Sequence, residues 1–270
     1  GRGRKPAGRG GGIMYGLQPV ASQVSSYLPV LEDRSLAIEI MDFGKGVNCS
    51  ISELKVAYAP VKDRLYAMHA PFLDQCLCSL DAAIREYSRK NFEAALNGAI
   101  ELSISNIVLH HNIFPTLLPQ SSLFIELLDC LLDYLYMIQQ RTRLTIFIEN
   151  VLDPTPDILQ GLMLRNENQQ IKVCLDVAHS ALSKVGVCQW VERLAPWIGH
   201  VHLADTQGVF DEHLPCGFGC IDWSSSVLMD LLAKDRVVGV FETANVEDTL
   251  RSLNHLEKID RNHEPKNIRI

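Results

Sequence analysis

Apolar residues recur along the chain in short runs that alternate with longer stretches of helical periodicity. Runs that are apolar almost throughout and only a few residues long are typical of parallel strands buried on both faces. Eight runs fit this description, each bounded by polar residues or by glycine and proline: Ile13–Leu17, Leu36–Met41, Leu65–His69, Asn106–His110, Leu144–Glu149, Lys172–Asp176, His200–Leu203 and Val237–Glu242.

Between these runs, apolar residues recur every three or four positions, as on one face of an amphipathic helix. The periodicity predicts helices, with weaker patterns in the last two ranges, over Asp81–Leu102, Ser121–Gln139, Ser183–Ala195, Ser224–Ala233, Val246–Leu256, Ala21–Leu31 and Ser50–Val56. Strands that alternate with helices through 270 residues predict an α/β fold, a (β/α)8 TIM barrel in a single domain. The alternative is a doubly wound open sheet, but no G-x-G-x-x-G motif follows a strand and the chain has no P-loop.

The composition is that of an ordinary globular protein, with 47% hydrophobic and 21% charged residues. No apolar run approaches the roughly 20 residues that a membrane span needs, and the N-terminus lacks the apolar stretch of a signal peptide. Eight cysteines occur without any C-x-x-C pair, which favours reduced thiols over a disulfide framework. We therefore expect a cytoplasmic protein with no membrane partner.

Charge is unevenly distributed. Residues 1–12 are rich in glycine and arginine and read as a basic flexible tail, whereas residues 13–270 are expected to form the barrel. Four of the 25 basic residues lie in the tail, which leaves 21 against 32 acidic residues, so the remainder carries a net charge near −11. Such a body argues against a nucleic-acid partner, because gripping a phosphate backbone needs clustered Lys and Arg. Oligomeric state has no signature in the sequence.

Acids and histidines gather at the carboxyl ends of the predicted strands. In TIM barrels these ends meet at one mouth, where active sites lie. A single acid at a strand end is often only a helix cap or an ion-pair partner. Several that converge are better explained by a divalent cation, because a buried acid without a partner is costly and cations bind imidazole and carboxylate groups. Six strands carry such a residue at or near their carboxyl end: His69, His110, Glu149, Asp176, His202 and Glu242.

At two strands, two nearby histidines compete for the role of metal ligand. His200 and His202 share one face of their strand, and His202, nearer its end, is the expected ligand, with His200 a hydrogen-bonded supporting residue. His110 is preferred to His111 on register. Asp205 is expected to orient a ligand or cap the loop that follows.

Loop residues supply further candidate ligands. His179 lies three residues after Asp176, where a strand turns into a loop. Asp211 and His213 form an Asp-x-His motif after the strand that carries His202. Each motif is weak by itself.

Taken together, these motifs resemble the xylose-isomerase-like TIM barrel superfamily (AP endonuclease family 2), which holds sugar isomerases and epimerases and the endonuclease IV-type phosphodiesterases. The resemblance extends from about Ile13 to Leu256 and is carried by His69-Ala-Pro, Val108-Leu-His110, Ile148-Glu149-Asn150, Asp176-Val-Ala-His179, His200-Val-His202-Leu-Ala-Asp205, Asp211-Glu-His213 with Gly217-Phe-Gly219, and Phe241-Glu242-Thr243.

The endonuclease IV-type branch implies a cluster of two to three metal ions, Zn²⁺ first and Mn²⁺ as the alternative. By this resemblance one ion would be held by His69, His110 and Glu149, and a second by Glu149, Asp176, His202 and Glu242. The third would be held by His179, Asp211 and His213. The implied reaction is hydrolysis of a phosphodiester or phosphoester.

The isomerase and epimerase branch implies one cation on Glu149, Asp176, His202 and Glu242. Its two glutamates, Glu149 and Glu242, would then be the catalytic acid and base on either side of a substrate carbon. That alternative gives no ligand role to His69, His110, His179, Asp211 or His213. A barrel that only binds a ligand or metal is a third alternative, disfavoured because the ligand set is complete.

Several loops depart from the endonuclease IV pattern. His111-Asn112-Ile113-Phe114-Pro115 follows the fourth strand in place of a Pro-Gly-Ser-His run, and Asn150-Val151-Leu152-Asp153 replaces a glycine-containing loop. The loop between His202 and Asp211 is short and has no lysine. An abasic-site DNA endonuclease therefore remains only an alternative. The expected substrate is a small phosphorylated molecule, such as a nucleotide, a sugar phosphate or the nucleotide loop of a cobamide.

Overall fold

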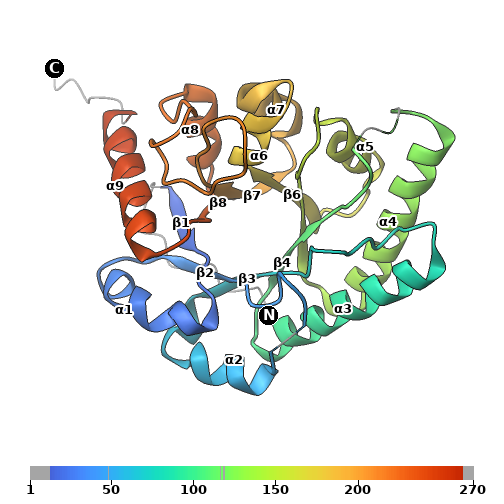
Figure 1. Cartoon of the computed structure of the whole chain (residues 1–270), viewed down its shortest axis with the longest axis horizontal. Helices are drawn as coiled ribbons and strands as arrows, with labels where there is room; N and C mark the ends of the chain where they lie inside the picture. Colours follow the sequence, from blue (N-terminus) through green and yellow to red (C-terminus); the bar gives the residue numbers. More distant parts are fainter. Residues whose placement is uncertain (1–12, 48, 116, 118, 264–270) are drawn as a thin grey trace.

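The computed structural model describes residues 13–47, 49–115, 117 and 119–263, and eight parallel strands within it close into a barrel (Figure 1). Every strand pairs with its neighbours in sequence, and β1 closes the ring on β8. The predicted (β/α)8 barrel is confirmed, whereas the predicted tail, residues 1–12, lies outside the described residues. The strands are β1 Met14–Leu17, β2 Ala37–Ile40, β3 Leu65–His69, β4 Asn106–His110, β5 Thr145–Glu149, β6 Ile171–Asp176, β7 Ile198–Leu203 and β8 Val238–Phe241.

Helices surround the strands on the outside of the barrel (Figure 1). None of the helices within the described residues is long and apolar enough to cross a membrane. The α-helices are α1 Val24–Asp33, α2 Ile51–Ala57, α3 Ala82–Glu101, α4 Ser122–Thr142, α5 Asp157–Arg165, α6 Val177–Leu182, α7 Gly186–Leu194, α8 Ser226–Leu232 and α9 Val246–His263, with 3-10 turns η1 Ala21–Gln23 and η2 Ala59–Arg64.

Two helices, α5 and α6, were not predicted. Both are short, and α6 begins directly after β6, with the Asp176 carboxylate accepting a hydrogen bond from the His179 N–H at 2.6 Å. Asp176 is therefore both the end of a strand and the N-cap of a helix. The predicted helix Ser183–Ala195 corresponds to α7, which starts at Gly186.

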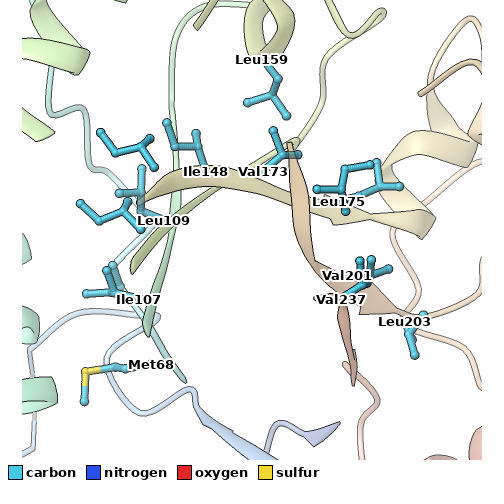
Figure 2. Close-up of a cluster of buried hydrophobic side chains, with 14 of the residues drawn as sticks. Met68, Ile107, Leu109, Ile148, Leu159, Val173, Leu175, Val201, Leu203 and Val237 are labelled. Atoms are coloured by element: carbon cyan, nitrogen blue, oxygen red, sulfur yellow. The ribbon is translucent and has the colours of Figure 1, made fainter. Parts of the chain in front are cut away.

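The main core lies between the strands and the helices. Alternate residues of the central strands point outward into it and are fully buried, among them Ile148, Val173 and Leu175. Figure 2 shows this layer, with Leu159 of α5 lying over the strands that carry Ile148 and Val173.

Inside the barrel the packing is different. Small apolar clusters fill part of the interior, one of them formed by Val108, Phe147 and Cys174. Because side chains alternate along a strand, Phe147 and Glu149 lie on the same face of β5. The interior thus passes from apolar residues to acids and histidines as the strands approach their carboxyl ends.

Candidate metal centre

Four donors from neighbouring strands form the centre of the site. Glu149 ends β5, Asp176 ends β6, His202 lies in β7 and Glu242 follows β8. One ligand atom from each lies within 4.8 Å of all the others. Parallel neighbouring strands bring their carboxyl ends to the same mouth, so residues far apart in sequence meet here.

Two atoms of this group are buried without a hydrogen-bond partner, namely Asp176 Oδ2 and His202 Nδ1. His202 Nδ1 lies 3.1 Å from Glu242 Oε2 and 3.3 Å from Glu149 Oε1, yet neither contact has hydrogen-bond geometry. Buried polar atoms are nearly always paired, so unpaired lone pairs that face one another need an explanation. A divalent cation fits this donor set, because it binds carboxylate and imidazole together.

A second set of donors adjoins the first through Glu149. The Nε2 atoms of His69 and His110 lie 3.1 Å and 3.3 Å from the same oxygen, Glu149 Oε2. On the far side of its ring, His69 Nδ1 donates to the carbonyl oxygen of Ala70 at 2.8 Å. A carbonyl only accepts, so His69 Nδ1 carries a proton. Loss of the other proton, which joins Nε2 to Glu149 in the metal-free protein, would leave the Nε2 lone pair for a metal ion.

A third set lies nearer to solvent. The Nε2 atoms of His179 and His213 are both 3.1 Å from Asp211 Oδ2. Their Nδ1 atoms donate to backbone carbonyls, that of His179 to Asn150 at 2.9 Å and that of His213 to Glu242 at 3.1 Å. When each ring loses the Nε2 proton that it shares with Asp211, its Nε2 lone pair becomes available to a metal ion beside the same carboxylate. The structure thus brings together all nine residues that the resemblance assigned to metal binding.

His110 and His111 differ in their surroundings. His111 is buried, and its Nε2 donates to Asp153 Oδ2 at 2.8 Å while its Nδ1 accepts from the N–H of Ile113 at 3.0 Å. Both ring nitrogens of His111 are therefore used within the protein, whereas His110 faces Glu149.

Glu39 was not identified from the sequence, although it lies at the centre of the barrel. It is fully buried in β2, and its Oε1 accepts from His202 Nε2 at 3.1 Å and from Gln18 Nε2 at 2.8 Å. This contact fixes the proton of His202 on Nε2 and leaves Nδ1 to face the other donors. A single glutamate inside the apolar run Leu36–Met41 was the signal that could have revealed it.

His200 lies in β7, two residues before His202. It is fully buried and stacks on Tyr66, and its Nε2 lies 2.8 Å from Glu39 Oε2, outside hydrogen-bond angles. The expected hydrogen bond of His200 is therefore not formed, and the residue is a core histidine beside Glu39. Cys174 Sγ is also close enough to His200 and His202 to complete a further possible donor group, which the sequence did not indicate.

Asp205 organises the loop that carries the third donor set. Its carboxylate accepts from the indole N–H of Trp223 at 2.8 Å and from the N–H of Gly217 at 2.9 Å. Its backbone pairs with Leu214 in both directions, at 2.8 and 2.9 Å. Asp205 therefore fixes the loop in which Asp211 and His213 lie.

The charges of the donors depend strongly on one another. Burial opposes ionisation of Glu149, but the His202 and His110 rings hold the pKa of its carboxyl well below the usual range. Burial raises the pKa of Asp176 to about 6. Burial disfavours a charged His213, but its contact with Asp211 raises the pKa of the imidazole to about 9. In the metal-free protein His213 therefore holds a proton at neutral pH that a cation would displace, whereas Glu149 is already ionised.

Comparison with known proteins shows the family and the fold of the chain. Residues 61–259 match the model of a family described as Xylose isomerase-like TIM barrel. The uncharacterized protein MJ1614 of Methanocaldococcus jannaschii is 28% identical over 248 residues, which cover 88% of this chain and 94% of that protein.

Two solved structures superpose on most of this chain. A D-tagatose 3-epimerase-like protein superposes with a TM-score of 0.72 at 23% identity, over 92% of this chain and 97% of that chain. Endonuclease IV from Thermus thermophilus superposes with a TM-score of 0.65 at 18% identity, over 92% of this chain and 99% of that chain. Identities this low show the fold alone, so the reaction must be argued from the donors.

Metal affinity should rise with pH. A pKa of about 9 for His213 means that its proton is still bound at pH 7 and must leave when a cation binds. Below pH 6, Asp176 also takes up a proton. We expect the affinity for Zn²⁺ to increase from pH 6 to pH 9, by up to about tenfold per pH unit for each proton displaced. Competition titration with a chromophoric chelator measures this, and an affinity independent of pH would contradict the assigned donors.

Replacing Glu39 should weaken metal binding without removing a ligand. In Glu39→Gln the amide can donate to His202 Nε2 and shift the proton of the ring to Nδ1, the atom that faces the other donors. Loss of such a supporting contact typically lowers metal affinity by about 10- to 100-fold. Glu101→Gln is the matched control, because Glu101 is half exposed and pairs with Lys55 at the surface. Equal zinc affinities for the two folded variants would show that Glu39 does not set the tautomer of His202.

Proposed function

The chain belongs to the xylose isomerase-like TIM barrel family, and on that premise we propose that it is a metal-dependent hydrolase of phosphodiester or phosphoester bonds. The observation that carries the proposal is the third donor set, in which His179 and His213 share one oxygen of Asp211. A mononuclear isomerase has no use for these donors, whereas a cluster of two or three cations needs them.

The donor types favour zinc, with manganese as the alternative. Mixed imidazole and carboxylate sites accept both ions, and the share of histidine supports zinc. When bound, clustered divalent cations neutralise a phosphoester, lower the pKa of a water molecule and stabilise the leaving oxygen. In the overall reaction, water adds to phosphorus, the ester P–O bond breaks, and the released alcohol takes the proton.

The protein's own residues hold and orient the donors. Glu149 joins two donor sets, because its Oε2 faces His69 and His110 while its Oε1 faces His202. Asn150 ties the ends of β5 and β6 together through two hydrogen bonds with the backbone of Asp176, at 2.8 and 3.0 Å. This bracing keeps the separation of the donors fixed, which preorganised catalysis requires.

A small phosphorylated substrate fits the mouth better than DNA. The segments that follow β3, β4, β5 and β7 (residues 70–81, 111–121, 150–156 and 204–225) contain no Lys or Arg. Binding to a nucleic-acid backbone depends on such residues. Nucleotides, sugar phosphates and the nucleotide loop of a cobamide are the substrate classes that we consider, and an abasic-site endonuclease is disfavoured.

A sugar isomerase or epimerase is the second candidate, because the central four-donor group is complete by itself. In that reaction Glu149 and Glu242 would exchange a proton with a substrate carbon. Both carboxylates lie within 3.3 Å of His202 Nδ1, so one cation could be held by this group alone.

Metal content and a single substitution separate the two candidates. We expect two to three equivalents of zinc per chain, and we expect His213→Ala to lose one of them. Hydrolysis of bis(p-nitrophenyl) phosphate by His213→Ala should fall by more than the roughly 10- to 100-fold that loss of an outer partner costs. Elemental analysis and initial rates measure the two effects.

The control is His255→Ala, a half-buried histidine of α9 that belongs to none of the donor sets. It should retain both metal and activity. One exchangeable ion per chain, together with unchanged turnover in His213→Ala, would contradict the hydrolase and favour the epimerase. Glu149→Gln should abolish either activity and serves as the inactive reference.

A further inference from the structure

A cavity of about 860 Å³ opens beside the donors, between the loops that follow β3, β4 and β5 and the start of α3. This volume is within the range of small-molecule sites. Its walls are largely apolar and include Phe72, Ile84, Tyr87, Phe114 and Leu152. Among the described residues that line it, none is a donor of the metal centre.

The cavity and the metal centre share one wall. The ring of Phe72 lines the cavity, and its centroid lies 5.3 Å from that of His69 and 4.7 Å from that of His110. A ligand that fills the cavity would therefore lie one side chain, that of Phe72, away from the donors His69 and His110.

Several polar groups around the cavity are paired within the protein and hold its loops in place. Asn112 donates from its side chain to the carbonyl oxygens of Phe72 at 3.1 Å and Gln75 at 2.7 Å. The buried His111–Asp153 pair, 2.8 Å long, joins the loops after β4 and β5. These contacts fix the loops, so the cavity is preformed, and its described lining contains no Lys or Arg to hold a phosphate.

The rim exposes apolar side chains to water. Leu152 is 70% exposed, Phe114 68%, Tyr87 58% and Ile84 48%. Apolar residues gathered around one concave site mark a binding surface, because covering them removes apolar area from water.

We infer that the substrate is a phosphoester with a bulky apolar group, such as an aromatic or branched alkyl ester. This inference rests on the proposed function: the phosphate lies at the donors, and the apolar group fills the cavity bounded by Phe72, Phe114 and Leu152. The cavity then selects among phosphoesters by size and polarity.

The test compares two phosphodiesters that differ only in the apolar group, benzyl methyl phosphate and dimethyl phosphate. With zinc-loaded protein we expect roughly 10- to 100-fold higher kcat/KM and a correspondingly tighter Kd for the benzyl ester, the usual range for added apolar contact in a pocket. Turnover is followed by phosphorus NMR and binding by calorimetry.

Leu152→Gln should remove most of this preference and leave dimethyl phosphate unaffected. Leu164→Gln is the matched control, since Leu164 is equally exposed, at 70%, but lies on α5 away from the cavity. It should behave as wild type.

Failure of this inference differs from failure of the proposed function. If neither ester is hydrolysed but the benzyl ester binds more tightly and Leu152→Gln abolishes the difference, the hydrolase is wrong and the apolar site stands. If the esters bind equally well, or if Leu152→Gln behaves as Leu164→Gln does, the apolar site is wrong. Light scattering that shows a dimer broken by Leu152→Gln would also overturn it, since a second copy would then cover the cavity.

Discussion

The site depends on one buried carboxylate, that of Glu149. One of its oxygens faces His69 and His110, and the other faces His202. A charged carboxylate with 1% of its surface exposed is stable only if positive charge or hydrogen bonds surround it. In the metal-free protein the His69 and His202 imidazoles supply that charge because, against the effect of burial, nearby carboxylates raise the pKa of each ring. Cations would supply it when the site is loaded. Because the three histidines come from β3, β4 and β7, Glu149 connects the site across the barrel mouth.

The barrel brings the donor residues together, and hydrogen bonds on the outer side of the histidine rings fix the orientation of those rings. Backbone carbonyls hold the outer nitrogens of His69, His179 and His213, and Glu39 holds that of His202. In each case the inner nitrogen is left to face a carboxylate. In the adjoining cavity, Asn112 and the His111–Asp153 pair likewise form hydrogen bonds within the protein that hold the loops together. The walls that remain for a ligand are largely apolar.

Much of this arrangement could be predicted from the sequence, because the strand ends carry the chemistry. Period-two alternation and the position of the last residue are enough to place His69 or Asp176 at the mouth. Glu39 could not be placed in the same way, since it lies within β2 and its role appears only when β7 brings His202 to it. Helix α6 was missed because Asp176 ends one element and caps the next. The cavity depends on three loops that meet only in the fold, so no local pattern reveals it.

We propose that this barrel mouth holds more than one cation. Anomalous diffraction from crystals of the zinc-loaded protein, measured on both sides of the zinc absorption edge, tests it most directly. We expect separate peaks at the His69–His110–Glu149 set, at the central four-donor group and at the His179–Asp211–His213 set, with at least two of the three present. A single peak confined to the four-donor group would contradict this proposal.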